Sequence, residues 1–171
     1  KKIPIVILSQ VPPGFTRKYL RKKNKLYYQV ETLVFGNAVF RALNPERFII
    51  GSYIPTKKLF HKYDTFLKSF KCPVINMKYE SAELAKIAIN CYLASSVSIT
   101  NTLAEVSETI GADWEEIIPT LMLDRRIGKF AYLKPGLGIS GGNIERDLTT
   151  IKNLGKRNGS NINLINSIIN L

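Results

Sequence analysis

One uninterrupted segment, residues 80–110, constrains the fold of this chain more than any other feature. It contains no glycine or proline, and Gly111 follows it directly. Apolar residues recur at helical spacing, at positions 84, 85, 87, 88, 91–94 and 97. The pattern predicts a single helix far longer than the usual length of about 11–12 residues. Such a helix must bury its broad apolar face on something large, and we expect a second copy of the chain to cover it.

The first 78 residues show a different pattern, in which short apolar runs alternate with polar, helix-compatible stretches. Four runs have the β-branched character of buried strands: 3–8, 26–32, 46–52 and 72–77. Helices are expected up to about residue 23, over 36–42 and over 55–70, the last starting with Pro55. This alternation is typical of an α/β layer. The sequence therefore predicts two domains, 1–78 and 79–171.

Three more helices are expected after the long one. Residues 112–121 carry Asp113 at a cap-like position with acidic residues in the first turn. Residues 143–158 and 161–171 give the other two, separated around Gly159. The chain stops on an apolar helix face, so we expect polypeptide to continue beyond Leu171.

Composition excludes several classes of protein. The net charge of +12 resides in residues 1–78, which hold 16 Lys and Arg against 3 Asp and Glu, whereas the remainder holds 9 against 10. The basic half could attract a phosphate-bearing ligand, form a solvated surface or be covered by other polypeptide. Because no known nucleic-acid-binding module accompanies it, nucleic-acid binding is ranked last. Cys72 and Cys91 are expected to be reduced and buried, and no metal site or membrane span is expected.

Five stretches carry a family resemblance. They are "SQVPPG" (9–14), "VETLVFGNAV" with "NPERFIIG" (30–51), the helix 80–113, "DRRIG" (124–128) and "PGLGISGGNIERD" (135–147). In this order they resemble the UDP-glucose/GDP-mannose dehydrogenases, which oxidise the C6 alcohol of a nucleotide sugar to a carboxylate with two NAD. The resemblance covers nearly the whole chain and is most specific over 80–147. Two parts of the family's proteins have no counterpart in this sequence: the first part of the coenzyme domain and the C-terminal nucleotide-binding domain.

The resemblance implies a fold, a cofactor and partners. The fold would be α/β, the C-terminal part of a Rossmann-like parallel-sheet domain followed by an all-helical central dimerisation domain with one long helix. The cofactor would be NAD, the substrate a nucleotide sugar, and the protein a cytoplasmic homodimer. No G-x-G-x-x-G follows the first strand, so the phosphate-binding fingerprint of the coenzyme is not found there.

The same resemblance assigns roles to particular residues. Lys86 and Asn90, one helical turn apart, match the pair that holds the developing oxyanion. Asp147 matches the aspartate that orients water or the lysine, and Glu31 the acid/base near the sugar. Arg126 matches an arginine that reaches the sugar site of a neighbouring subunit. Gln10 occupies a position on the nicotinamide side, and Leu33, Gly138 and Gly141 match positions on the substrate side.

The departures concern the chemistry itself. Family members attack the aldehyde with a cysteine thiolate, but Asn143 stands at that position, or Ile144 if the alignment slides by one residue. Arg146 replaces a lysine, Gln10 a threonine and Phe35 a glutamate. Because an amide cannot form a thioester, we expect no four-electron oxidation. Two hypotheses stay open: a piece or divergent member of an NAD-dependent nucleotide-sugar dehydrogenase, and a non-catalytic binding or dimerisation module.

Overall fold

The computed structural model describes residues 3–21, 25–33, 36–136, 138 and 142–170. These residues form two compact units, 1–86 and 87–171, and the longest helix contributes to both. The prediction that the functional domains meet between residues 78 and 79 stays a prediction. No helix in the described ranges is long and apolar enough to cross a lipid bilayer.

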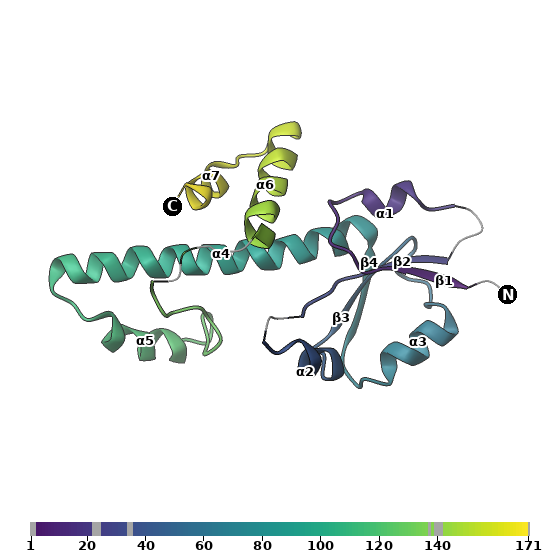
Figure 1. Cartoon of the computed structure of the whole chain (residues 1–171), viewed down its shortest axis with the longest axis horizontal. Coiled ribbons are helices and arrows are strands. Elements are labelled where there is room, and N and C mark those ends of the chain that lie inside the picture. Colours follow the sequence, from purple (N-terminus) through teal and green to yellow (C-terminus); the bar gives the residue numbers. More distant parts are fainter. Residues whose placement is uncertain (1–2, 22–24, 34–35, 137, 139–141, 171) are drawn as a thin grey trace. The chain divides into compact units, whose positions relative to one another are not determined.

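The first unit is built on a four-stranded sheet in the order β1-β2-β3-β4 (Figure 1). Its strands are β1 (Pro4–Ile7), β2 (Lys25–Gln29), β3 (Phe48–Ser52) and β4 (Val74–Lys78). Three helices lie between them: α1 (Phe15–Lys18), α2 (Ala38–Leu43) and α3 (His61–Lys68). The α/β class expected from the sequence is confirmed.

The sheet is mixed, whereas a parallel sheet is expected from the sequence. β1 pairs with β2 and β3 with β4 in parallel, but β2 and β3 run antiparallel, with Tyr28 opposite Gly51. A parallel pair needs a crossover that packs on the sheet, and antiparallel neighbours do not. The only helix between β2 and β3 in the described residues is α2, which buries none of its side chains. The chain can therefore reverse direction there.

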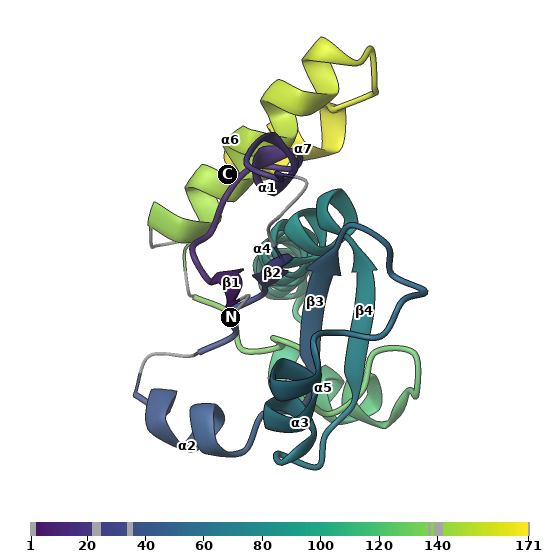
Figure 2. The same cartoon turned by 90° about the vertical axis from the view of Figure 1, so that its right-hand side faces the viewer.

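β3 is buried along its whole length because both faces of the sheet are covered. On one face Tyr27, Phe48 and Ile50 pack against Tyr63 and Leu67 of α3. On the other face lies the start of the long helix α4 (Tyr79–Ile110). Figure 2 shows the neighbouring strands β3 and β4 side by side. A Cβ built on Gly51 would lie 3.1 Å from Ala82 Cβ and from Tyr79 Cα, so glycine permits the close approach.

Three predictions need correction. α3 begins at His61 and not at residue 55, because Phe60 is extended and donates its backbone N–H to the hydroxyl of Tyr27 over 3.0 Å. Cys72 and Cys91 are free, but both are partly exposed and not buried. The helix expected up to residue 23 is the single turn α1.

An ion pair between Arg17 and Glu80 gives the first unit a pH dependence. The guanidinium contacts both carboxylate oxygens and lowers the pKa of Glu80 to about 2. Because the folded pKa lies below the unfolded value of about 4.3, the pair stabilises above pH 4.3 and loses its effect as the pH falls toward 2. Both side chains are more than a third exposed, so the effect is below about 1 kcal/mol. The difference in melting temperature between the parent and Glu80→Gln should shrink from pH 7 to pH 3.

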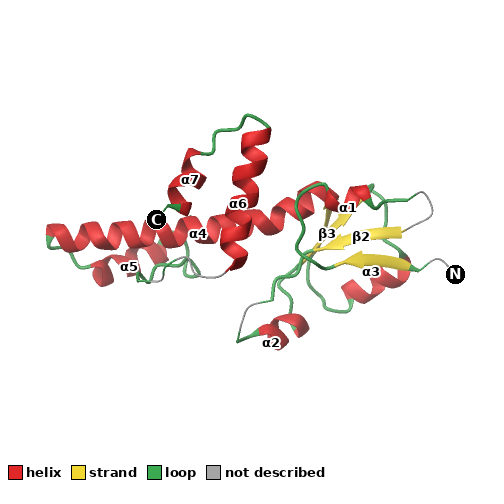
Figure 3. Cartoon of the chain, turned by 45° about the horizontal axis from the view of Figure 1, so that its top comes forward, coloured by secondary structure: helices red, strands yellow, loops and turns green. Residues whose placement is uncertain are grey.

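In the described part of the second unit, every regular element is a helix (Figure 3). α4 continues to Ile110 and is followed by α5 (Trp114–Leu123), α6 (Gly142–Arg157) and α7 (Asn163–Ile169). The predicted cap is confirmed, since Asp113 accepts the backbone N–H of Glu115 over 2.9 Å. The long helix and the helical character of this unit therefore agree with the sequence.

Side chains of α4 and α5 hold the strand-free segment that precedes the glycine-rich loop. Thr100 donates to the carbonyl of Tyr132 over 2.7 Å, and Trp114 Nε1 donates to the carbonyl of Leu133 over 2.8 Å. The backbone N–H of Gly136 donates to Asn101 Oδ1 over 3.0 Å. The entry to the loop is thus fixed by contacts with two helices.

Candidate functional site

A buried polar pair joins two helices of the second unit. Asn90 of α4 donates from Nδ2 to Asp147 Oδ2 of α6 over 2.6 Å. The two residues are only 8% and 2% exposed. Burying an amide and a carboxylate in a helical interior is costly unless they are hydrogen-bonded. The structure therefore brings together two of the residues that the resemblance assigned to the site.

Asn143, which the resemblance aligns with the family's cysteine, lies one turn before Asp147 on the same helix. Asn143 is exposed, and its Oδ1 accepts a hydrogen bond from Arg146 Nη2 over 3.1 Å. Arg146 also places Nε 3.9 Å from Asp147 Oδ1. Arg146 thus links the amide at the nucleophile position to the buried carboxylate. An amide offers neither a thiolate nor a leaving group for covalent chemistry.

The thiol of Cys91 in the second unit is poorly suited to act as a nucleophile. Cys91 follows Asn90 on α4 and packs beside the buried cluster of Ala94, Leu148 and Ile168. Burial and then the negative charge of Asp147 raise the pKa of the Cys91 thiol above its usual value. The thiolate is the reactive form, so this cysteine stays protonated and weakly nucleophilic near neutral pH.

Lys86 lies on α4 one helical turn before Asn90 and is half-buried. It is the last residue of the first unit, whereas Asn90 belongs to the second. The helix is continuous across both positions, so the i, i+4 spacing expected from the sequence is present. The role of Lys86 in holding an oxyanion stays a prediction.

The other predicted residues of the first unit lie in loops beside the sheet. Gln10 follows β1 and is half-buried. Glu31 and Leu33 follow β2 and are exposed. The carboxylate of Glu31 accepts the backbone N–H of Leu33, so it stabilises its own turn. The role of Glu31 as an acid/base near the sugar stays a prediction.

Arg126 is paired within its own segment. Its guanidinium contacts Asp124 twice, with Nη2–Oδ2 at 2.6 Å and Nε–Oδ1 at 3.0 Å. The pair lowers the pKa of Asp124 and raises that of Arg126. The arginine side chain is 88% exposed. Its predicted reach to a neighbouring subunit would require exchange of this surface ion pair, which is worth little in free energy.

The glycine-rich loop is described in part, and Gly141 lies outside the described residues. Gly136 has φ of +92°, a conformation that favours glycine. Gly138 is exposed, and a Cβ built on it would meet no described atom within 4 Å. No described residue therefore packs so closely against position 138 that it would require a glycine there.

A cavity of about 490 Å³ opens beside this loop in the second unit. Polar residues of α4 line it at i, i+3, i+4 and i+7 spacing: Ser98, Asn101, Thr102 and Glu105. Among the described residues, the buried Oγ of Ser98 has no hydrogen-bond partner. Sequence reasoning missed these four residues, although their helical spacing is a visible signal. Gly138 and Glu145 also line the cavity.

Comparison with solved structures defines the class of protein. A UDP-glucose dehydrogenase from Pyrobaculum islandicum is similar with a TM-score of 0.80 and 25% identity, covering 96% of this chain and 40% of that one. UDP-D-ManNAc dehydrogenase from Pyrococcus horikoshii matches with a TM-score of 0.74 and 21% identity, over 98% and 41% of the two chains, which concerns the fold alone. The fold is that of the nucleotide-sugar dehydrogenases.

Sequence comparison then gives the family. Residues 80–171 match the model of the UDP-glucose/GDP-mannose dehydrogenase family, central domain. UDP-glucose 6-dehydrogenase TuaD of Bacillus subtilis is 33% identical over 96% of this chain and 37% of its own length. UDP-glucose 6-dehydrogenase of Rickettsia bellii is 30% identical over 96% of this chain and 39% of its own length. The chain belongs to the UDP-glucose/GDP-mannose dehydrogenase family and spans less than half the length of these relatives.

Proposed function

We propose that this chain is the sugar-site part of an NAD-dependent nucleotide-sugar dehydrogenase of the UDP-glucose/GDP-mannose type, acting in the synthesis of polysaccharide precursors. One observation carries the proposal: the buried hydrogen bond between Asn90 and Asp147 in the part of the chain that matches the family model. Replacing a buried polar pair by apolar residues is often neutral or stabilising, so stability alone does not demand this pair.

In this proposal the side chains have separate tasks. The Lys86 ammonium and the Asn90 amide donate hydrogen bonds to the oxygen at sugar C6. Asp147 holds the Asn90 amide in a fixed orientation through the 2.6 Å bond. The exposed backbone at Gly138 accommodates the nucleotide sugar at close range.

The glycine spacing at residues 136–141 does not by itself make a coenzyme site. The spacing G-x-G-x-x-G occurs at 136–141, but a dinucleotide site requires a strand immediately before it, and residues 129–136 contain none. No hydride-transfer step is therefore assigned to these residues. Gln10, after β1, is the residue for which a position on the nicotinamide side is proposed.

A second candidate function is a nucleotide-sugar-binding module without catalysis. Asn143 favours it, because the amide is engaged with Arg146 and cannot capture an aldehyde covalently. The protonated thiol of Cys91 does not restore that chemistry. The two candidates share the sugar site and differ in whether an oxidised product is released.

Titration of the full chain with UDP-glucose and with GDP-mannose tests the proposal. One of the two is expected to bind, and Lys86→Ala should weaken binding at least about tenfold, because hydrogen bonds from charged groups are worth about 1.5–3 kcal/mol. Lys156→Ala, the same change at an exposed site on α6, should leave binding unchanged. The measurement is isothermal titration calorimetry. If the chain binds neither UDP-glucose nor GDP-mannose, both candidate functions are rejected.

Product analysis tests whether Asn143 blocks the second oxidation. With NAD and the sugar nucleotide that binds, the chain is expected to release no uronic acid, as measured by liquid chromatography and mass spectrometry. Steady production of uronate would show that Asn143 does not block the second oxidation.

A further inference from the structure

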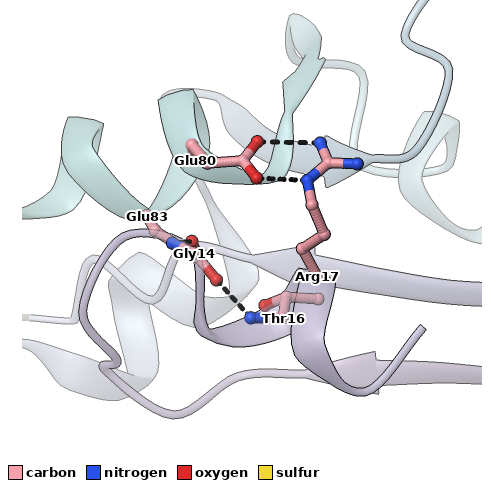
Figure 4. Close-up of polar contacts among 5 residues, drawn as sticks. All are labelled: Gly14, Thr16, Arg17, Glu80 and Glu83. Carbon is pink, nitrogen blue, oxygen red and sulfur yellow. Dashed lines mark hydrogen bonds and ion pairs between the residues drawn. The ribbon is translucent and has the colours of Figure 1, made fainter.

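Two carboxylates at the start of α4 hold the segment that follows β1 (Figure 4). Glu83 is fully buried and accepts two backbone N–H groups, from Gly14 over 2.5 Å and from Thr16 over 2.7 Å. Glu80, one turn earlier, forms the bidentate ion pair with Arg17. All of these residues belong to the first unit.

Glu83 performs a task that is usually local in sequence. The first N–H groups of a helix are normally satisfied by the side chain of the residue that caps it. In α1 the cap position is Gly14, with φ of +90° and no side chain, and no local cap bond forms. A carboxylate 67 residues further along the chain accepts the N–H of Thr16 instead. The turn before α1 therefore depends on Glu83 for its position.

The two ends of this contact carry residues with proposed roles. The turn contains Gln10 to Gly14, for which we propose a position on the coenzyme side. Glu83 precedes Lys86 by three residues, so both lie on neighbouring positions of one helix face. Hydrogen bonds to a buried carboxylate are short and strong, which makes this connection stiff.

We infer that Glu83 is a positioning residue that fixes the turn 10–14 relative to Lys86. The positioning role rests on the proposed function, whereas the hydrogen bonds of Glu83 are present whatever the function is. Glu83 acts through the backbone of Gly14 and Thr16 and not by contact with substrate. Glu80 and Arg17 contact the same segment at the surface and serve as the natural comparison.

Amide exchange measured by NMR on the full chain tests the contact. Glu83→Gln keeps the shape of the side chain but presents an NH₂ group to one of the two N–H donors. Exchange at Gly14 and Thr16 should become about tenfold to a hundredfold faster, the change expected when a hydrogen bond to a charged group is lost. Glu80→Gln, the same substitution one turn away, should change these rates less than about threefold. Unchanged exchange in Glu83→Gln would overturn the inference.

The buried amide of Ile50 in β3 controls for unfolding. If Glu83→Gln accelerates exchange at Ile50 as much as at Gly14, the variant has lost its fold. The same exchange measurement on Glu83→Asp then tests the inference. This variant keeps the charge on a shorter side chain, and faster exchange confined to Gly14 and Thr16 supports the inference. Exchange at the parent rate at both positions would count against it.

Ligand-induced chemical shifts test positioning as distinct from simple stabilisation. Addition of the sugar nucleotide that binds, UDP-glucose or GDP-mannose, to the parent should shift the resonances of Lys86 and of the Gly14 amide together. In Glu83→Gln the shift at Gly14 should be lost and that at Lys86 retained, whereas Glu80→Gln should keep both. A shift at Gly14 that survives Glu83→Gln would refute the positioning role. If Lys86 does not respond in the parent, the proposed sugar site fails, and the exchange rates still decide whether Glu83 holds the turn.

Discussion

Replacing Asn90 by leucine is expected to lower the free energy of unfolding by about 2–3 kcal/mol. The substitution removes a donor 2.6 Å from the carboxylate of Asp147, which is 2% exposed. A buried charge that loses a hydrogen bond retains its desolvation cost. For a chain of this size the melting temperature should fall by roughly 4–12 °C. Thermal unfolding followed by circular dichroism measures the change.

Two further variants separate this pair from general effects of the substitution. Asn153→Leu makes the same change at an exposed position of α6 and should alter stability by less than about 0.5 kcal/mol. The double variant Asn90→Leu with Asp147→Leu should recover a large part of the loss, because it removes both polar partners. A loss in Asn90→Leu no greater than that in Asn153→Leu would show that the pair contributes nothing.

The second large effect concerns self-association through α4. In the second unit, large apolar side chains are exposed along one stripe of this helix. Successive members lie seven, four, three and four residues apart: Tyr92, Ile99, Leu103, Val106 and Ile110. Their exposed fractions range from 43% to 81%. The heptad-like spacing is that of helices that pack against each other along their length. We propose that a second copy of the chain covers this stripe.

The double variant Leu103→Glu with Ile110→Glu should weaken dimerisation at least about a hundredfold, because each buried, unpaired carboxylate costs several kcal/mol. Thr109→Glu introduces the same charge at an exposed position about 100° around the helix from Ile110 and should leave the dimer intact. Analytical ultracentrifugation over a range of concentrations measures both. A parent chain that is monomeric at micromolar concentration would contradict the proposal.

The sequence predicted the candidate site in part. The i, i+4 relation of Lys86 and Asn90 follows from helix geometry, and both residues lie on α4 as expected. The pairing of Asn90 with Asp147 spans 57 residues and has no local signal. The resemblance alone placed both in one site, and the structure supplies the contact. The setting of Cys91 near the charge of Asp147 also emerged only from packing.

The sequence by itself determined the long helix, the α/β character of the first unit and the family, because these depend on periodicity and on residues that are neighbours along the chain. Only the tertiary structure decided the antiparallel pairing of β2 with β3, the late start of α3, the Asn90–Asp147 bond and the capping of α1 by Glu83. Each of these depends on contacts between segments far apart in sequence. Their energies depend on burial and geometry, which no local pattern of residues encodes.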